Sequence, residues 1–222
     1  STSLRMPTFT DLFYSGPTNL GNPDLKPEKS VNYEGGIKVN YSGFSGHTGA
    51  FHRRGKDLID WVREKETDKW QTKNLTKINS TGIEVSGNFF PEKIWNKKLF
   101  ITKLGLNYSY IYLDKGGNNF FSNYVLDNLK HKLDMELNNK IWSNLKASWR
   151  VSYQDRNGMR TKTEPYDPFW LVNTRVMWKT PSTEIYAMAA NLFETAYFDL
   201  GIIQQPGRWI SLGINYQVRL KK

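Results

Sequence analysis

The chain has 222 residues and a formal net charge of +10 at pH 7, from 31 Lys and Arg against 21 Asp and Glu. It contains no cysteine, which excludes disulfides, a thiol nucleophile and thiolate metal sites. Its apolar runs are far shorter than the ~18 residues of a transmembrane helix. No block of five or six like charges indicates a basic tail. Strands could still cross a membrane, because a barrel strand carries its hydrophobicity on every second residue.

The N-terminal part, residues 5–36, is interpreted as one long loop that leads into a strand. Its prolines fix φ and remove backbone donors, so neither a helix nor a central strand is expected to pass through it. They are Pro7, Pro17, Pro23 and Pro27. Residues 1–6 read as the outer half of a strand already under way and lack the features of a signal peptide. We therefore expect a fragment or one piece of a split protein.

From residue 31 onward the sequence alternates between apolar and polar residues, which is typical of strands with two different faces. Strands are predicted near residues 31–41, 47–62, 71–89, 99–112, 129–138, 145–154, 172–179, 185–198 and 210–220. The last one, for example, places Ile210, Leu212 and Ile214 on one face and Ser211 and Gly213 on the other. With the initial half-strand, this gives nine complete strands and one partial strand.

Two regularities indicate a transmembrane barrel. The apolar faces persist for about ten residues, the length of a tilted strand that crosses ~25 Å of outer-membrane hydrocarbon. The connections alternate between short ones near positions 43, 92, 143 and 182 and longer ones near 66, 118, 162 and 203, as in bacterial barrels. Tryptophans fall near both kinds of connection, which favours two aromatic girdles. They are Trp95, Trp142 and Trp178 near short connections, and Trp61, Trp70, Trp170 and Trp209 near long ones.

Two ordered motifs carry a resemblance to a known family. Residues 5–13 read Arg-Met-Pro-Thr-Phe-Thr-Asp-Leu-Phe and residues 21–28 read Gly-Asn-Pro-Asp-Leu-Lys-Pro-Glu, followed by Tyr33-Glu34 and Gly36. This resembles the signature of TonB-dependent outer-membrane transporters. Near the other end, Asn191-Leu192-Phe193 with Tyr197, and Pro206-Gly207-Arg208 before a last alternating strand, are similar to the C-terminal part of that family.

The resemblance implies an all-β, antiparallel transmembrane β-barrel of which residues 1–222 form the C-terminal portion, about ten strands of 22. A plug domain and the N-terminal strands would lie outside this chain. Implied partners are the rest of the barrel and the plug, on the same or a separate chain, the TonB-ExbB-ExbD system and outer-membrane lipid. A surface lipoprotein is a further partner that the resemblance allows, whereas nucleic acid is not expected. The implied function is energised uptake without covalent chemistry.

Ligand recognition is expected from aromatic and amide side chains in the outer loops, because rings supply rigid contact area and amides orient a polar ligand. The candidates are Phe13, Tyr14, Trp70, Asn118, Asn119, Phe120, Phe121, Tyr124 and Tyr166. Basic residues on the polar faces are expected to line the lumen, where they could hold a plug or attract an anionic solute. These are Lys103, Lys130, Lys132, Arg150, Arg175 and Arg219.

No catalytic or metal site is predicted, and no cofactor is expected. His47 and His52 are five apart on one strand and so face opposite sides, and His131 lies among leucines. Two loop clusters of carboxylates could bind Ca²⁺, but neither has the ligand spacing of an EF-hand loop. The first comprises Asp57, Asp60 and Glu64, and the second Glu164 and Asp167.

Two short segments bear on which solute is transported. Residues 8–21 contain no histidine, which argues against a haem receptor of this family. Residues 51–62 look most similar to cobalamin transporters of the Bacteroidota, which favours vitamin B12 over ferric siderophores. An outer-membrane barrel enzyme and a soluble basic β protein that binds nucleic acid are two further alternatives. The second is disfavoured because the aromatic residues share faces with leucines instead of lysines.

Overall fold

The computed structural model describes residues 1–65, 67–114, 121–122, 128–161 and 164–217. Its strands are β1 (Thr2–Arg5), β2 (Asn19–Leu20), β3 (Glu28–Tyr41), β4 (Phe44–Arg63), β5 (Trp70–Phe89), β6 (Ile101–Asp114), β7 (Phe121–Ser122), β8 (Leu129–Lys140), β9 (Leu145–Arg156), β10 (Phe169–Lys179), β11 (Thr183–Ala190) and β12 (Trp209–Tyr216). Two five-residue helices, α1 (Phe9–Phe13) and α2 (Pro91–Trp95), lie in the connections. Neither described helix is long or apolar enough to span a membrane.

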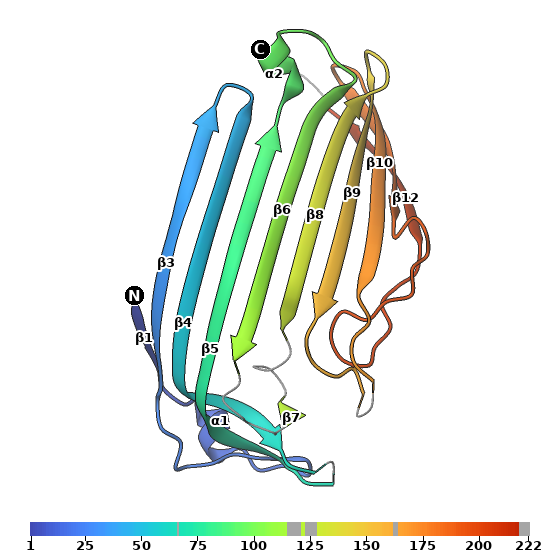
Figure 1. The fold of residues 1–222 in the computed structure, drawn as a ribbon. Helices are drawn as coiled ribbons and strands as arrows, with labels where there is room; N and C mark the ends of the chain where they lie inside the picture. The colour runs from blue at the N-terminus through green and yellow to red at the C-terminus, as the bar shows by residue number, and fades with distance from the viewer. Residues whose placement is uncertain (66, 115–120, 123–127, 162–163, 218–222) are drawn as a thin grey trace, which may run out of the picture.

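The strands form one curved sheet in which chain neighbours pair antiparallel. The order is β1-β3-β4-β5-β6-β8-β9-β10-β11-β12, with β2 beside β5 and β7 beside β4. The short connections lie together at one end of the sheet, here called the short-turn end, at the top of Figure 1. The long connections lie at the opposite, long-loop end. The predicted nine long strands, the partial strand before them and the alternation of connections are confirmed.

The register places the apolar residues of neighbouring strands in continuous rows. Val85 pairs with Tyr108 on β6, which pairs in turn with Leu133 on β8. Farther along, Val176 pairs with Ala187, which pairs with Leu212. Residues that pair directly share a face, so these rows form one apolar surface. Leu212 is 81% exposed, and Leu133 and Val176 are half-buried, so this surface is open and not a sealed core.

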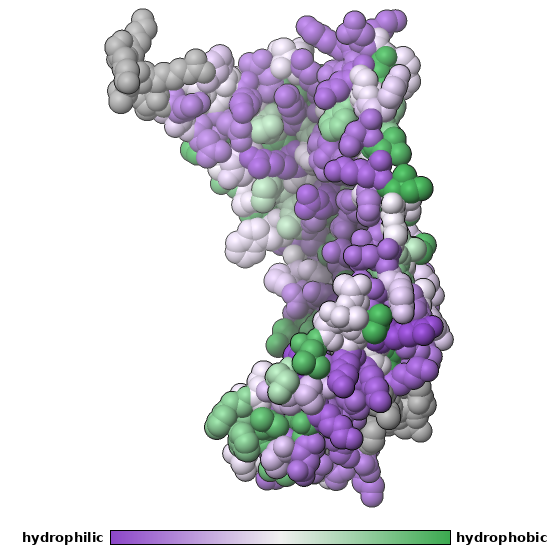
Figure 2. Space-filling view, turned by 90° about the vertical axis from the view of Figure 1, so that its left-hand side faces the viewer, coloured by the Kyte–Doolittle hydropathy of each residue, from purple (hydrophilic) through white to green (hydrophobic). Residues whose placement is uncertain are grey.

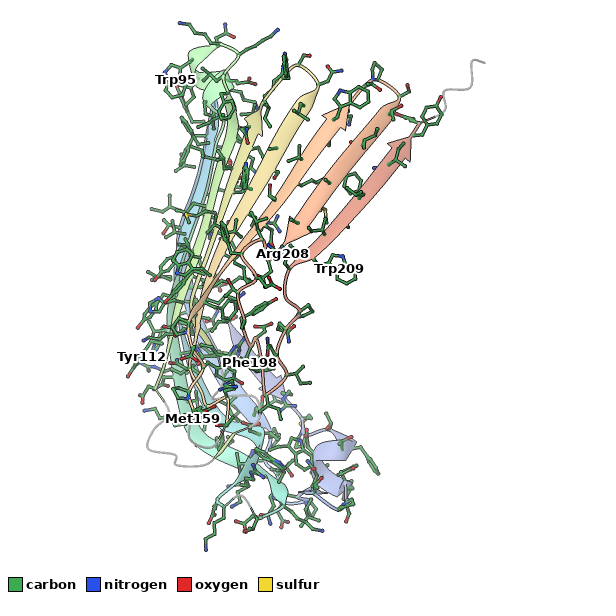
Figure 3. The ribbon with its side chains drawn as sticks, turned by 90° about the vertical axis from the view of Figure 1, so that its right-hand side faces the viewer. Trp95, Tyr112, Met159, Phe198, Arg208 and Trp209 are labelled. Atoms are coloured by element: carbon green, nitrogen blue, oxygen red, sulfur yellow. The ribbon has the colours of Figure 1, made fainter. Side chains whose placement is uncertain are left out.

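The apolar surface is convex and the polar surface is concave. Tyr112, in one of the apolar rows, projects outward from the convex side of the sheet in Figure 3. The concave side carries the other residues of the same strands, such as Glu84, Ser109 and Lys132. Figure 2, viewed along the sheet from the β1 and β3 side, shows hydrophobic residues on the upper convex margin and mostly hydrophilic residues on the near face. A wall with one apolar and one wet face is the construction of a transmembrane barrel.

The tight connections have local causes. Gly43 has φ of +80°, and a Cβ there would lie 2.5 Å from Ile94 Cγ1, so the β3–β4 turn needs glycine. The turn is shorter than predicted, because β4 already begins at Phe44. Pro91 begins α2, where its missing N–H costs no helical hydrogen bond, and Asn96 ends the helix in the left-handed region.

Three sequence expectations are wrong in detail. The segment expected to exclude helices contains α1, because the prolines flank residues 9–13 and Thr8 and Asp11 form a capping box. The strand expected at 185–198 ends at Ala190, because Asn191 and Glu194 both have positive φ. A register shift between Leu129 and His131 places Leu129 opposite Arg156, so Leu129 belongs to the polar face instead of the apolar one.

A small hydrophobic core lies at the long-loop end, where β4 and β5 continue beyond their neighbours. Both strands have 20 residues, against 14 in β3 and in β6. Val62, Leu75 and Ile78 are at most 4% exposed and pack with Leu58 and Leu113. The part of the β4–β5 hairpin that extends beyond β3 and β6 thus supports a compact loop assembly.

Trp61 and Trp70 belong to this assembly and not to an aromatic girdle, which corrects the sequence expectation for these two residues. Trp61 packs edge-to-face on Tyr14, with ring centroids 6.2 Å apart, and the Arg63 guanidinium lies 4.4 Å from the centre of the Trp70 ring. The physical reason is that the hairpin carries both tryptophans past the end of the apolar surface. Trp170, Trp178 and Trp209 remain exposed on the wall or at its rim.

Candidate functional site

The N-terminal loop is fastened to the wall by an ion-pair cluster at the long-loop end. The Arg5 guanidinium donates to Glu28 Oε1 at 2.6 Å and lies 3.6 Å from Asp11 Oδ2. The same Glu28 oxygen accepts from the backbone N–H of Ile59 at 2.7 Å. One carboxylate therefore joins β1, β3 and β4.

The cluster lies beyond the apolar rows, and its charges stabilise one another. Burial by itself would raise the pKa of Glu28, but the hydrogen bonds from Arg5 and the Ile59 N–H outweigh it and lower that pKa. The hydrogen bond to Glu28 in turn raises the pKa of Arg5. Both groups are therefore charged throughout the physiological pH range.

Amide side chains fasten the next part of the loop to β5. Asn74 accepts from the Lys26 N–H at 2.8 Å and donates to the Lys26 carbonyl at 2.9 Å. Thr72, which is fully buried, donates to the Asp11 carbonyl at 2.7 Å. Gly21 passes so close that a Cβ would lie 2.9 Å from the Asp11 and Leu12 carbonyl oxygens. The motif residues therefore build a rigid corner.

The corner presents an aromatic surface on the concave side. The capping box of α1 orients its five residues so that Phe9 is 79% and Phe13 57% exposed, with their ring centroids 5.1 Å apart. Figure 3 shows α1 on the concave side of the sheet, and Figure 2 shows a hydrophobic patch at this position. Exposed rings beside a wet interior can supply contact area to a ligand.

A second corner joins β10, β11 and β12. Asn191 is buried, its N–H donates to Asn173 Oδ1 at 2.8 Å, and its side chain bonds the N–H and the carbonyl of Thr195 at 2.9 and 2.8 Å. Arg208 pairs with Glu194 at 3.1 Å. Asn191 tolerates the positive φ that ends β11, which explains why the motif has asparagine there.

Several basic residues of the concave face pair with carboxylates. Lys103 pairs with Glu136 at 2.8 Å, and Arg175 pairs with Glu184 at 2.9 Å. Lys132 lies 3.9 Å from Asp134. A hollow of about 540 Å³ on this face, near the N-terminal corner, is lined by Ser30, Asn32, Phe51, Arg53, Ser80 and Leu113 among others.

The predicted ligand-binding residues divide into three groups. Phe13 and Tyr14 are exposed beside α1, while Trp70 is half-buried under Arg63. Tyr166 is 6% exposed, and its hydroxyl accepts from the Gly201 N–H at 2.7 Å. The placements of Asn118, Asn119, Phe120 and Tyr124, and the side chain of Phe121, lie outside the described residues. A direct ligand contact of any of them stays a prediction.

The predicted lumen residues follow the register. Lys103, Lys132, Arg150 and Arg175 lie in rows of the concave face, and Lys130 lies at the register shift of β8. Arg219 lies outside the described residues. Phe9 and Arg53 were missed as site candidates. Phe9 sits between two proline-marked segments, and the capping pattern of Thr8 and Asp11 is the signal that could have revealed it.

The histidines and carboxylates form no metal site in the described part of the chain, where no three metal-binding side chains come together. His52 Nδ1 bonds Thr81 Oγ1 at 2.8 Å, and His131 Nδ1 bonds the Tyr108 hydroxyl at 2.9 Å. These pairs satisfy polar groups on the apolar face, where lipid offers no partner. His47 faces the opposite side from His52, as predicted.

Comparison with known proteins identifies the family. The profile of the family described as TonB dependent receptor-like, beta-barrel matches residues 1–192. The chain belongs to this family. In outer-membrane barrels of bacteria the short turns are periplasmic and the long loops extracellular, so the loop assembly of this TonB-dependent receptor barrel lies outside the cell.

Curated relatives match over most of the chain. The vitamin B12 transporter BtuB of Photobacterium profundum is 24% identical over 204 residues, which cover 88% of this chain and 31% of the relative. The iron-regulated outer membrane virulence protein of Vibrio cholerae is 26% identical over 243 residues, 97% of this chain and 36% of the relative. The chain thus spans about a third of these two relatives.

Solved structures show the same fold. The copper transporter OprC superposes with a TM-score of 0.76 at 14% identity, covering 97% of this chain and 36% of that one. The siderophore receptor PirA from Pseudomonas aeruginosa superposes with a TM-score of 0.63 at 14% identity, covering 97% and 35%. The predicted fold class, a partial TonB-dependent receptor barrel, is confirmed.

Proposed function

We propose that this chain forms a sector of the wall and the extracellular mouth of a transporter that takes up a scarce solute through the outer membrane. The observation that carries the proposal is the pairing of an apolar convex face with a wet concave face, over which a rigid loop corner turns its aromatic residues. Family membership adds the plug domain as the movable part and the TonB-ExbB-ExbD system as the energy source. No covalent step is required.

For the solute we propose cobalamin. The similarity of residues 51–62 to cobalamin transporters and the match to BtuB support this choice. The charge pattern supports it too, because Lys103, Lys132 and Arg175 are each engaged by a carboxylate. A lumen in which several cations are already paired suits a large polar solute of low net charge better than a highly anionic one. Exposed Phe9 and Phe13 would contact the apolar parts of such a solute.

A ferric siderophore is the second candidate. The iron-regulated protein of Vibrio cholerae matches over 97% of this chain, and the siderophore receptor PirA shares the fold. Arg53 provides one exposed cation at the concave hollow that an anionic ligand could use.

Titration of the complete purified receptor with cyanocobalamin and with ferric enterobactin distinguishes the two. We expect cobalamin to bind with a submicromolar dissociation constant, and the double variant F9A/F13A to weaken binding about tenfold, since each ring contact is worth ~0.5–1.5 kcal/mol. The matched control is Phe100→Ala, an exposed phenylalanine at the short-turn end, which should bind normally. Cobalamin binding that is micromolar or weaker would refute this substrate, and uptake that persists in a strain without TonB would refute the transport mechanism.

A further inference from the structure

The convex face carries a row of basic residues just beyond its apolar rows. Lys29 on β3 pairs directly with Lys56 on β4, and Lys56 pairs directly with Lys77 on β5. All three side chains are exposed. Like charges directly opposite one another on neighbouring strands repel, so three adjacent lysines are unfavourable unless an anion binds between them.

The protein supplies little negative charge to this row. None of the three lysines forms an ion pair with a carboxylate among the residues for which the structure gives placements. The adjacent row adds Arg54, also exposed, which pairs with Asn79. Asp114 lies opposite Asn79 on β6, and Asp57 follows Lys56 on β4. The four cations therefore outnumber the carboxylates that the register brings to them.

These residues line a hollow on the convex face. The hollow, of about 480 Å³, is lined by Lys29, Arg54, Lys56, Lys77 and Asn79 together with Ser30, Val31 and Gly55. The Oδ1 atom of Asn79 is buried and accepts no hydrogen bond from the described residues. A hydroxyl group of a bound molecule could donate to this oxygen, while its phosphates contact the lysines.

The height of the row matches the polar zone of the outer leaflet. The outermost aromatic row of the apolar surface is Tyr33–His52–Thr81–Tyr112. Lys29 lies four residues beyond Tyr33, which is about 10 Å along the membrane normal for a strand rising ~3.3 Å per residue at a tilt of ~40°. Arg54 lies two residues beyond His52, at about 5 Å. Figure 2 shows hydrophilic residues on this lower part of the convex margin.

We propose that this basic row, Lys29, Arg54, Lys56 and Lys77, binds the phosphate groups of an anionic glycolipid of the outer leaflet, of the lipid A type. Basic residues near a membrane surface bind anionic head groups, and clusters of them create lipid-specific sites. The paired strands fix the backbone positions of these residues, so their cationic ends lie close enough together to reach neighbouring phosphates. The lipid then removes the repulsion within the row and anchors the β3–β5 part of the wall, where the loop assembly is attached.

The test measures lipid binding by the complete receptor in detergent, with native mass spectrometry and titration as the readouts. The probes are bisphosphorylated lipid A, dephosphorylated lipid A with the same acyl chains, and inorganic phosphate. We expect the triple variant K29Q/K56Q/K77Q to bind bisphosphorylated lipid A about 100-fold more weakly than the wild type. Lys56→Gln alone, with minimal effect on folding, should weaken binding about fivefold. The control K97Q/K98Q/K146Q removes the same charge at the short-turn end and should bind normally.

Three outcomes would overturn the proposal: equal binding by the wild type and the triple variant, equal binding of phosphorylated and dephosphorylated lipid A, or inorganic phosphate alone binding as tightly as the lipid. Cobalamin affinity in the same samples is an independent readout. A receptor that binds cobalamin normally but shows no preference for phosphorylated lipid A refutes this proposal without affecting the proposed function.

Discussion

The N-terminal corner should depend on one carboxylate, and the substitution Glu28→Ala tests this. Glu28 Oε1 accepts from Arg5 at 2.6 Å and from the Ile59 N–H at 2.7 Å, and Ile59 is 5% exposed. Removing the ion pair with half-exposed Arg5 costs about 1 kcal/mol. Leaving a buried N–H without an acceptor costs about 1–3 kcal/mol more. We therefore expect local opening to become easier by about 2–4 kcal/mol.

Amide hydrogen exchange of Ile59 measures this opening directly. Because ~1.4 kcal/mol corresponds to a factor of ten, exchange in the alanine variant should be about 30- to 700-fold faster. Glu28→Gln keeps an oxygen for the Ile59 N–H and loses only the charge, so about fivefold is expected. Glu34→Ala, on the same strand, bonds Asn32 and not Ile59, and should leave this amide unchanged. Exchange in the alanine variant within threefold of the wild type would refute the role of Glu28.

Further predictions concern the same corner, the second corner and the aromatic surface. The folded-state pKa of Glu28 is lowered, so its contribution to the stability of the corner is complete above the ordinary glutamate pKa range and is lost as the pH falls through the lowered pKa. Protease resistance of the corner should therefore fall with acidification in the wild type but not in Glu28→Gln. Gly21→Ala should destabilise the corner by about 1–3 kcal/mol in thermal denaturation, whereas Gly35→Ala, which meets no atom within 4 Å, should not, and equal melting curves would contradict the close approach. Asn191→Ala should lower the unfolding temperature of the barrel, measured as the temperature at which its gel migration changes from that of the folded to that of the unfolded form. Asn191→Gly should lower it less, because glycine readily adopts the positive φ, and the reverse order would contradict the backbone argument. Phe13→Ala alone should weaken cobalamin binding about threefold to tenfold by fluorescence titration, and an unchanged dissociation constant would remove Phe13 from the binding surface.

The wall could be predicted from the sequence because its two faces repeat with period two. Ile210, Leu212 and Ile214 lie on one face whatever the neighbouring strands contribute, so strand identity and orientation follow from the alternation. The end of β11 could not be located in this way. Apolar residues such as Leu192, Phe193 and Tyr197 continue past Ala190, while the backbone turns because Asn191 adopts a left-handed conformation that its tertiary hydrogen bonds stabilise.

The candidate site was less predictable, since its residues meet through tertiary contacts. The motif residues Arg5 and Glu28 were recognised by resemblance, but their pairing and the bond from Ile59 join positions far apart in sequence. Tyr166 was selected as an aromatic loop residue, but it is buried and its hydroxyl accepts from the Gly201 N–H, a contact that no local pattern reveals. Short helices such as α1 are equally difficult, because five residues are too few for a periodic signal.

The continuity of β4 and β5 has a mechanical consequence. The same two strands that cross the apolar layer also form the support of the N-terminal corner, and they pair on both sides of Asp57, from Phe44–Phe89 to Lys56–Lys77 and from Leu58–Leu75 to Val62–Gln71. We therefore expect the corner to move together with the wall and not as a separate lid. In the uptake proposed above, passage of the solute at this side of the mouth would then depend on rotation of side chains on α1 or on movement of other loops.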